Sequence, residues 1–300
     1  MKRIIARLSP RDSQVLMFLW LWKVAPLSII QHRYYPGTNL RRAYHRLNQL
    51  NRAGLVKQII LSEIDILPGE SMLRLWALSN RGYQHVKGKL PPLKEDGYRS
   101  ENPLHDWLVS SFHLGNYLGA VPETIKLCTE QQLRRFEPRE LPEWIPPADH
   151  HRPDGYWGVM KESAQVAYAI EVELHAKRDS DYQVLGEFYA IYPQVDRVFW
   201  LVPTKRFAER IQKAIQQCHQ ERTQIHSYLL LSQFQDMGWK APIVYGQDCS
   251  KTLDQILPKP ARPNGVQGPS SWTEKLWMSS SISTAIPRIS SNPENSPHFN

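Results

Sequence analysis

Hydrophobic and polar positions near the start of the chain repeat with a helical period. Ser9 stands before Pro10, a combination typical of a helix start, and apolar residues then recur through Trp22. We therefore predict a mostly buried helix at 10–23. A short second helix is expected to end near Gly37.

The clearest helical pattern follows, in the run TNLRRAYHRLNQLNRAG. We expect Thr38 or Asn39 to cap this helix and Gly54 to end it, with its apolar residues on one face. The other face carries a polar and mainly basic set: Arg41, Arg42, His45, Arg46, Gln49 and Arg52. No acidic residue occurs between Asp12 and Glu63, which favours contact with DNA phosphates or base edges over a merely solvated face.

Two extended segments come next and predict a β-hairpin. They span 55–67 and 71–79, are joined by the turn residues PGE, and are followed by the start of a closing helix. Helix, short helix, basic helix and hairpin is the order of a winged helix-turn-helix, in which the third helix enters the major groove. We predict such a DNA-binding domain over residues 1–97.

The pattern changes after a polar linker with proline and glycine at 87–103. The order predicted beyond it is α-β-β-β-α-β-α-β, and the strand–helix alternation after residue 166 implies parallel pairing. From 258 onward proline, serine and asparagine accumulate, which predicts a disordered tail. The expected fold is α+β, with an α/β domain built on a mixed sheet at 98–257 and a tail at 258–300.

Three acids in the second half are candidates for metal chemistry. Asp154 lies in HHRPDGYW, and Glu171 and Glu173 lie in AIEVELHAKRD. The α-β-β-β-α-β order is the frame of restriction-endonuclease-like domains, where acids on the second and third core strands converge on Mg²⁺. Asp154 and Glu171 are the predicted ligands of Mg²⁺ or Mn²⁺, which could generate hydroxide and stabilise a phosphorane.

Glu173 departs from the usual pattern of that fold, because a lysine normally stands at its position. Glu173 could act as a base or ligand instead, and Lys177 could reach back, so both are candidate catalytic residues together with Asp154 and Glu171. The sequence leaves three interpretations of these acids open. They could form an intact metal site, form a site that has lost its activity, or be ordinary polar residues, in which case Asp154 caps a turn. A zinc site has no support from helical histidine spacing or from cysteines.

The charge distribution and the cysteine content indicate what kind of protein this is. The chain has 300 residues and a net charge of +8, and its first 99 residues carry 17 basic and 6 acidic side chains. A basic third joined to a mildly acidic remainder indicates a polyanion-binding module. The three cysteines form no CxxC pair, and the longest apolar run, at 15–22, is too short to span a bilayer. We expect a cytoplasmic protein without membrane contact.

The chain resembles the replication-relaxation family of plasmid and mobile-element proteins, which includes MobC-like mobilisation accessories. The resemblance covers about residues 7–210 and lies in LSPRDSQVL, AYHRLNQLNRAGLV, WALSNRGYQHV, LHDWLVSSFHL, TEQQLRR, RPDGYW and AIEVELHAKR, in that order. It implies a winged helix fused to a nuclease-like domain that acts in plasmid replication control or transfer.

These observations lead to three expectations for function. The first is a DNA-binding protein of a mobile element that binds double-stranded DNA and acts in replication control or mobilisation, with a relaxase or replication protein and a second copy of itself as candidate partners. The second is a Mg²⁺-dependent endonuclease. The third is a winged-helix repressor whose second half has no catalytic role.

Overall fold

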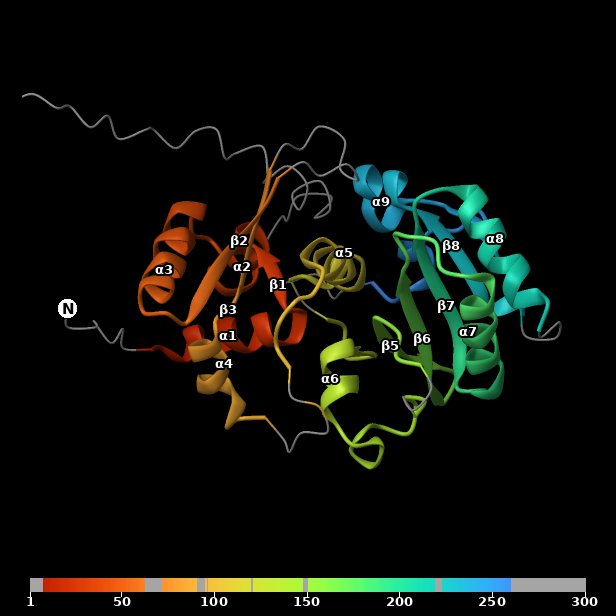
Figure 1. Ribbon diagram of the computed structural model, residues 1–300, viewed down its shortest axis with the longest axis horizontal. Helices are drawn as coiled ribbons and strands as arrows, with labels where there is room; N and C mark the ends of the chain where they lie inside the picture. The colour runs from red at the N-terminus through yellow and green to blue at the C-terminus, as the bar shows by residue number, and fades with distance from the viewer. Residues whose placement is uncertain are drawn as a thin grey trace, which may run out of the picture.

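The computed structural model describes residues 8–62, 72–90, 95, 97–119, 121–147, 151–218 and 223–259. This part of the chain is a mixed α and β structure with one sheet of three strands and one of six. The small sheet and the large sheet lie at opposite ends of the molecule, and helix α5 lies between them (Figure 1). The predicted hairpin turn and the tail from residue 260 lie outside the described residues.

The N-terminal half follows the predicted order of helices and hairpin and adds one short strand. Its elements are α1 (Pro10–Trp22), β1 (Val24–Pro26), α2 (Leu27–Tyr34), α3 (Leu40–Arg52), β2 (Val56–Ser62), β3 (Met72–Leu78) and α4 (Asn80–Lys87). The sheet order is β1-β3-β2, and both pairings are antiparallel. Strand β1 has three residues and exists through its pairing with β3, which is why no hydrophobic pattern predicted it.

Local signals explain where the first helices begin. A capping box closes the start of α1, with the Asp12 amide donating to Ser9 Oγ and the Ser9 amide donating to the Asp12 carboxylate. At α3 the cap is Asn39 rather than Thr38, because Asn39 Oδ1 accepts from the Arg42 amide. The predicted apolar face of α3 is buried against the small sheet and its neighbouring helices.

The second half contains the predicted series of strands and helices with several short additions. Its elements are α5 (Pro103–Leu114), β4 (Ile125–Thr129), α6 (Glu130–Arg135), β5 (Gly155–Lys161), β6 (Ala164–Val172), α7 (Asp179–Ile191), β7 (Val195–Val202), α8 (Lys205–Gln216), β8 (His226–Leu230), α9 (Leu231–Met237), β9 (Ile243–Gly246) and α10 (Leu253–Ile256). Helices α6, α9 and α10 and strand β9 were not predicted.

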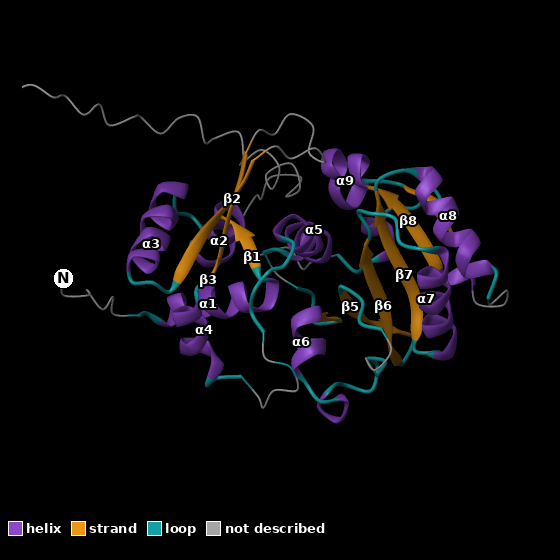
Figure 2. Cartoon of the chain, viewed as in Figure 1, coloured by secondary structure: helices purple, strands orange, loops and turns teal. Residues whose placement is uncertain are grey.

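The large sheet is mixed, as predicted. Its order is β4-β5-β6-β7-β8-β9, with antiparallel pairing from β4 to β6, parallel pairing from β6 to β8, and an antiparallel β9 at the edge. Helices α7 and α8 cover one face, while α5 and α9 lie on the other (Figure 2). The central strands are buried on both faces, which accounts for the continuous apolar run in β7.

The two halves share buried surface through α5. Val24 and Leu75 of the small sheet belong to the same buried cluster as Trp107 and Phe112 of α5 and Trp157 of the large sheet. The predicted boundary at 97/98 falls in a segment without helix or strand that precedes α5. The first half therefore completes part of its core with residues from the second. No helix among the described residues is long and apolar enough to cross a membrane.

Candidate functional site

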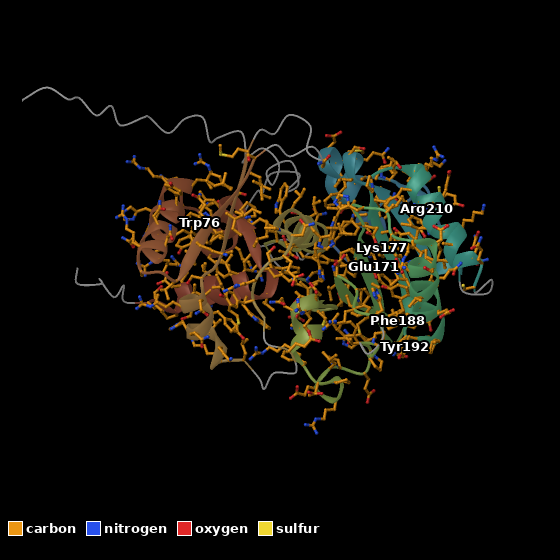
Figure 3. All side chains as sticks on the ribbon, in the orientation of Figure 1. Trp76, Glu171, Lys177, Phe188, Tyr192 and Arg210 are labelled. Carbon is orange, nitrogen blue, oxygen red and sulfur yellow. The ribbon has the colours of Figure 1, made fainter. Side chains whose placement is uncertain are left out.

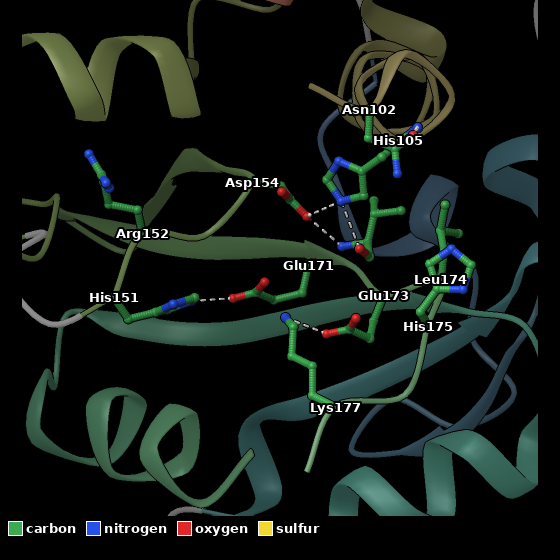
Figure 4. Close-up of a pocket in the computed structure, with 11 residues that line it drawn as sticks. Asn102, His105, His151, Arg152, Asp154, Glu171, Glu173, Leu174, His175 and Lys177 are labelled. Carbon is green, nitrogen blue, oxygen red and sulfur yellow. Dashed lines mark hydrogen bonds and ion pairs between the residues drawn. The ribbon is translucent and has the colours of Figure 1, made fainter. Parts of the chain in front are cut away.

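A pocket of about 270 Å³ opens at one end of the large sheet, between the start of α5 and the connection from β6 to α7. It is lined by Asn102, His105, His151, Arg152, Asp154, Glu171, Val172, Glu173, Leu174, His175 and Lys177 (Figure 4). The structure thus brings all four predicted catalytic positions to one pocket, although they come from separate segments. Pairing of β5 with β6 is the cause, since it sets the start of one strand beside the end of the other.

The close approach of α5 to the sheet depends on Gly155, the residue after Asp154. A Cβ atom at Gly155 would lie 2.7 Å from His113 Cε1 on α5 and 2.9 Å from the carbonyl oxygen of Cys128 on β4. Both distances are shorter than real Cβ contacts. A side chain at this position would therefore push α5 away from the residues that line the pocket.

Asp154 is held by the backbone of β6 and by a histidine of α5. Its Oδ2 accepts from the Val172 amide at 2.7 Å and lies 3.5 Å from His105 Nε2, which is also 2.9 Å from the Val172 carbonyl oxygen. Burial lowers the pKa of His105, but Asp154 and Asp106 outweigh it and raise that pKa to about 11. Burial raises the pKa of Asp154, and His105 and the Val172 amide more than reverse this, so the pKa lies below its usual value.

Glu171 is buried and held through a single oxygen. His151 Nε2 lies 2.6 Å from Glu171 Oε1, and the Tyr189 hydroxyl on α7 donates to the same oxygen. Burial raises the pKa of Tyr189 well above its usual value, and the nearby Glu171 adds to this, so the phenol remains a donor. The carboxylate is therefore oriented by two groups from outside its own strand.

Glu173 points into the same pocket and is paired with Lys177. The Lys177 Nζ atom lies 2.6 Å from Glu173 Oε2, and Figure 4 shows the lysine side chain reaching back into the pocket. Burial raises the pKa of Glu173 above its usual value, and Lys177 opposes only part of that shift. Lys177 therefore places an ammonium in the pocket, beside the carboxylate of Glu173.

The carboxylates can be tested as ligands for a hard cation. Asp154, Glu171 and Glu173 each use one oxygen for the contacts above, and their other oxygens have no hydrogen-bond partner among the described residues. Within that part of the chain, no group of three or more His, Cys, Asp or Glu side chains is already gathered around one point. Mg²⁺ usually binds through one or two carboxylates and keeps several waters, and the lining of this pocket offers Asp154 and Glu171 for that role.

Two residues that orient the acids were not predicted from the sequence. His105 lies near the start of α5, where Asn102 caps the helix, and Tyr189 lies in the last turns of α7. Neither belongs to a spacing pattern that includes the acids. His151, which contacts Glu171, also belongs to no such pattern, and the residues that line the pocket include no cysteine.

The basic helix α3 forms a second candidate surface. Its outer face points away from both sheets at one end of the molecule, far from the pocket that contains the labelled Glu171 and Lys177 (Figure 3). The exposed side chains on this helix are Arg41, Arg42, His45, Asn51 and Arg52. The nearby strand β2 adds the exposed Lys57, so this surface has several cations and no acid.

Arg46 and Gln49 of the same helix have partners within the protein. Arg46 Nε lies 2.9 Å from Asp12 Oδ1, Arg46 Nη2 lies 2.5 Å from Asp12 Oδ2, and Arg46 Nη1 donates to Gln49 Oε1 at 2.7 Å. Asp12 is almost fully buried at the start of α1. Arg46 thus holds α3 to α1. The contact of Arg46 with DNA that the sequence predicts is not tested by this arrangement.

Comparisons of the chain with protein-family models, with curated proteins and with solved structures find no match. The resemblance to the replication-relaxation family therefore stays an expectation from the sequence motifs. Support for any function comes from the residues of this chain and their geometry.

Proposed function

We propose that this chain is a DNA-binding protein of a plasmid or other mobile element, acting in replication control or mobilisation. In this proposal α3 contacts double-stranded DNA, and the pocket of the second half holds Mg²⁺ or Mn²⁺ at Asp154 and Glu171. A relaxase or replication protein is the expected partner. The two functional surfaces then lie over two different buried clusters of the same chain.

The observation that carries the DNA-binding part is the charge and exposure of α3. Helix α2, the turn at 35–39, α3 and the β2–β3 hairpin follow one another as in a winged helix-turn-helix, in which the third helix enters the major groove. Arginine is the residue best suited to phosphate and guanine contacts, and three arginines of α3 face outward. A helix that only needed solubility would be expected to carry acids as well.

Binding of duplex DNA as a function of salt tests this part. Changing Arg41, Arg42 and Arg52 to Gln should weaken binding and reduce the log–log salt slope by about 0.9 for each lost phosphate contact. The matched control is Lys205, Arg206 and Lys213 changed to Gln, because these residues lie on α8 at the other end of the molecule. Equal effects of the two triple variants would refute the role of α3.

The pocket supports the metal part and favours a Mg²⁺-dependent endonuclease as the second candidate. Asp154 and Glu171 would hold the ion, which when bound supplies an activated water and neutralises charge on a phosphate. Lys177 places a positive charge at the pocket, and Glu173 is a buried carboxylate whose raised pKa suits proton transfer. The order α5, β4, β5, β6, α7 and β7, with the short helix α6 inserted after β4, agrees with the α-β-β-β-α-β order on which this proposal is based.

Nicking of supercoiled plasmid separates the three candidates. An endonuclease should nick with Mg²⁺ or Mn²⁺ and lose this activity in Glu171→Gln. A non-cutting protein of replication or mobilisation should bind DNA and metal without nicking. A repressor without catalysis should bind DNA, show no nicking, and show no response to metal.

A further inference from the structure

Lys23 has an unusual backbone and lies at the junction of the two halves. It ends α1 with φ +60° and ψ −43°, a region that residues with a Cβ rarely occupy. Such conformations persist where the surroundings impose them, and they cluster at functional positions. The contacts of the Lys23 side chain account for this backbone conformation.

The Lys23 ammonium is buried between two carboxylates of the second half. Its Nζ atom lies 3.1 Å from Asp106 Oδ1 on α5 and 2.5 Å from Glu130 Oε2 on α6, and the Lys23 side chain is only 10% exposed. Burial lowers the pKa of Lys23, but Asp106 and Glu130 more than reverse the shift. A buried ammonium of this kind is tolerated only with such partners.

Both carboxylates belong to segments that touch Asp154. Asp106 Oδ1 lies 3.9 Å from His105 Nδ1, and Nε2 of the same ring lies 3.5 Å from Asp154 Oδ2. On the other side, the Glu130 amide donates to the Asp154 carbonyl oxygen at 3.3 Å. Lys23 is therefore linked to the side chain of Asp154 through α5 and to its backbone through α6.

Helix α1 extends this link to the basic helix. Asp12 at the start of α1 binds Arg46 of α3, and Lys23 stands at the end of α1, directly after its last residue, Trp22. A single helix thus has helix α3 bound at one end and the network around Asp154 bound at the other.

We propose that Lys23 is a positioning residue that fixes Asp154 through Asp106 and His105, so that the N-terminal half sets the geometry of the pocket. The effect of Lys23 on metal binding rests on the proposed metal site at Asp154 and Glu171. The effect of Lys23 on the position of Asp154 rests only on the contacts described above. The two parts can therefore be tested separately.

A double-mutant cycle in the full chain tests the positional part. Lys23→Met and Asp154→Asn are made singly and together, and the urea midpoints are measured. The two side chains do not touch, so independent residues would give additive effects, whereas members of one network are non-additive. We expect Asp154→Asn to lower the urea midpoint less in the Lys23→Met variant than in the wild type. In that variant Asp106 is no longer held by Lys23, so His105 is already less well positioned. Additive effects would overturn the proposal.

The matched control is Lys161, which pairs with Asp196 at the opposite end of β5 from Asp154. Lys161→Met should be additive with Asp154→Asn. If Lys23→Met does not fold, Asp106→Asn replaces it in the cycle, because it breaks the same link while keeping the shape of the side chain.

Calorimetric titration with Mn²⁺ tests the metal part. Lys23→Met or Asp106→Asn should weaken Mn²⁺ binding about tenfold, as outer-shell changes commonly do, and Lys23→Arg should recover most of the loss. Lys161→Met should bind as the wild type does. Unchanged Mn²⁺ affinity in Lys23→Met would overturn the positioning of the metal site. A wild type that binds no Mn²⁺ would refute the proposed site itself, and the cycle would still decide the positional part.

Discussion

Arg46 on α3 binds Asp12 on α1 through both of its carboxylate oxygens, with Nε to Oδ1 at 2.9 Å and Nη2 to Oδ2 at 2.5 Å. Burial raises the pKa of Asp12, and Arg46 and the Ser9 amide and hydroxyl more than reverse this shift. An arginine from the face predicted to bind DNA is therefore part of the internal structure. Arginines of one helix face have different roles, depending on whether an acid lies within reach.

This pair predicts that two arginines four positions apart will behave differently. Arg46→Gln should lower the free energy of unfolding by about 2–3 kcal/mol, because it leaves the charge of a buried carboxylate without its partner. The exposed Arg42→Gln should change it by less than about 0.5 kcal/mol. Urea denaturation of both variants provides the measurement, and equal losses would contradict the assigned roles.

The buried His226 predicts a loss of stability in mild acid. Burial lowers the pKa of His226 to about 3, and its Nδ1 accepts from Trp200 Nε1 at 3.0 Å. In the unfolded chain the group takes up a proton near its ordinary value of 6.5, while the folded protein does not. Stability from this group is therefore present above pH 6.5 and falls with decreasing pH, approaching about 1.4 kcal/mol per pH unit until the folded pKa near 3 is reached.

The variant His226→Asn separates this effect from other titrations. Asn can offer an oxygen to Trp200 but does not titrate, so the decrease in stability between pH 6.5 and 4.5 should be smaller than in the wild type. His85 on α4 is exposed, and His85→Asn is the control. Urea midpoints at several pH values give the comparison. If His226→Asn and the wild type lose stability in parallel, the neutral buried state of His226 is wrong.

The shared core predicts that the first 97 residues will not form a stable unit without α5. Such a fragment would expose Val24, Leu75 and Ala77 and would leave the ammonium of Lys23 without Asp106 and Glu130. A fragment of residues 1–119 contains α5 and should unfold more cooperatively and at higher urea. Circular dichroism during urea titration compares the two. Equal midpoints would show that the N-terminal half completes its core alone.

The hydrophobic pattern predicted those parts of the fold whose signals are local. The apolar stripe of α3 and the continuous run of β7 need no knowledge of distant residues, and both elements were expected. Strand β1 depends on β3, some fifty residues away, so its three residues carry no signal of their own. Helix α6 is different, because the capping box of Thr129 and Gln132 was present in the sequence as a start signal.

In the candidate site, too, the residues that could be predicted are those whose arrangement depends on nearby residues in the sequence. Period-2 spacing in an extended segment puts Glu171 and Glu173 on the same face, and antiparallel pairing of β5 with β6 brings Asp154 to the same end of the sheet. His105 lies 49 positions before Asp154, and no rule of spacing connects the two. The partners of Asp154 and Glu171 depend on how α5 and α7 pack on the sheet, and this packing is a tertiary feature that spacing along the chain does not encode.

Whether Asp154 and Glu171 share one divalent cation is tested most directly by the melting temperature of the full chain in increasing Mn²⁺. The wild type should be stabilised, by about 2.7 kcal/mol at a hundred times Kd, because the ion binds only the folded state. Asp154→Asn should lose this response, since its amide can still accept from the Val172 amide but is a weak, uncharged ligand. Asp179→Asn, an exposed change on α7 outside the pocket, should respond as the wild type does. A wild type whose melting temperature does not change with Mn²⁺, or an Asp154→Asn variant that is stabilised equally, would contradict the metal site.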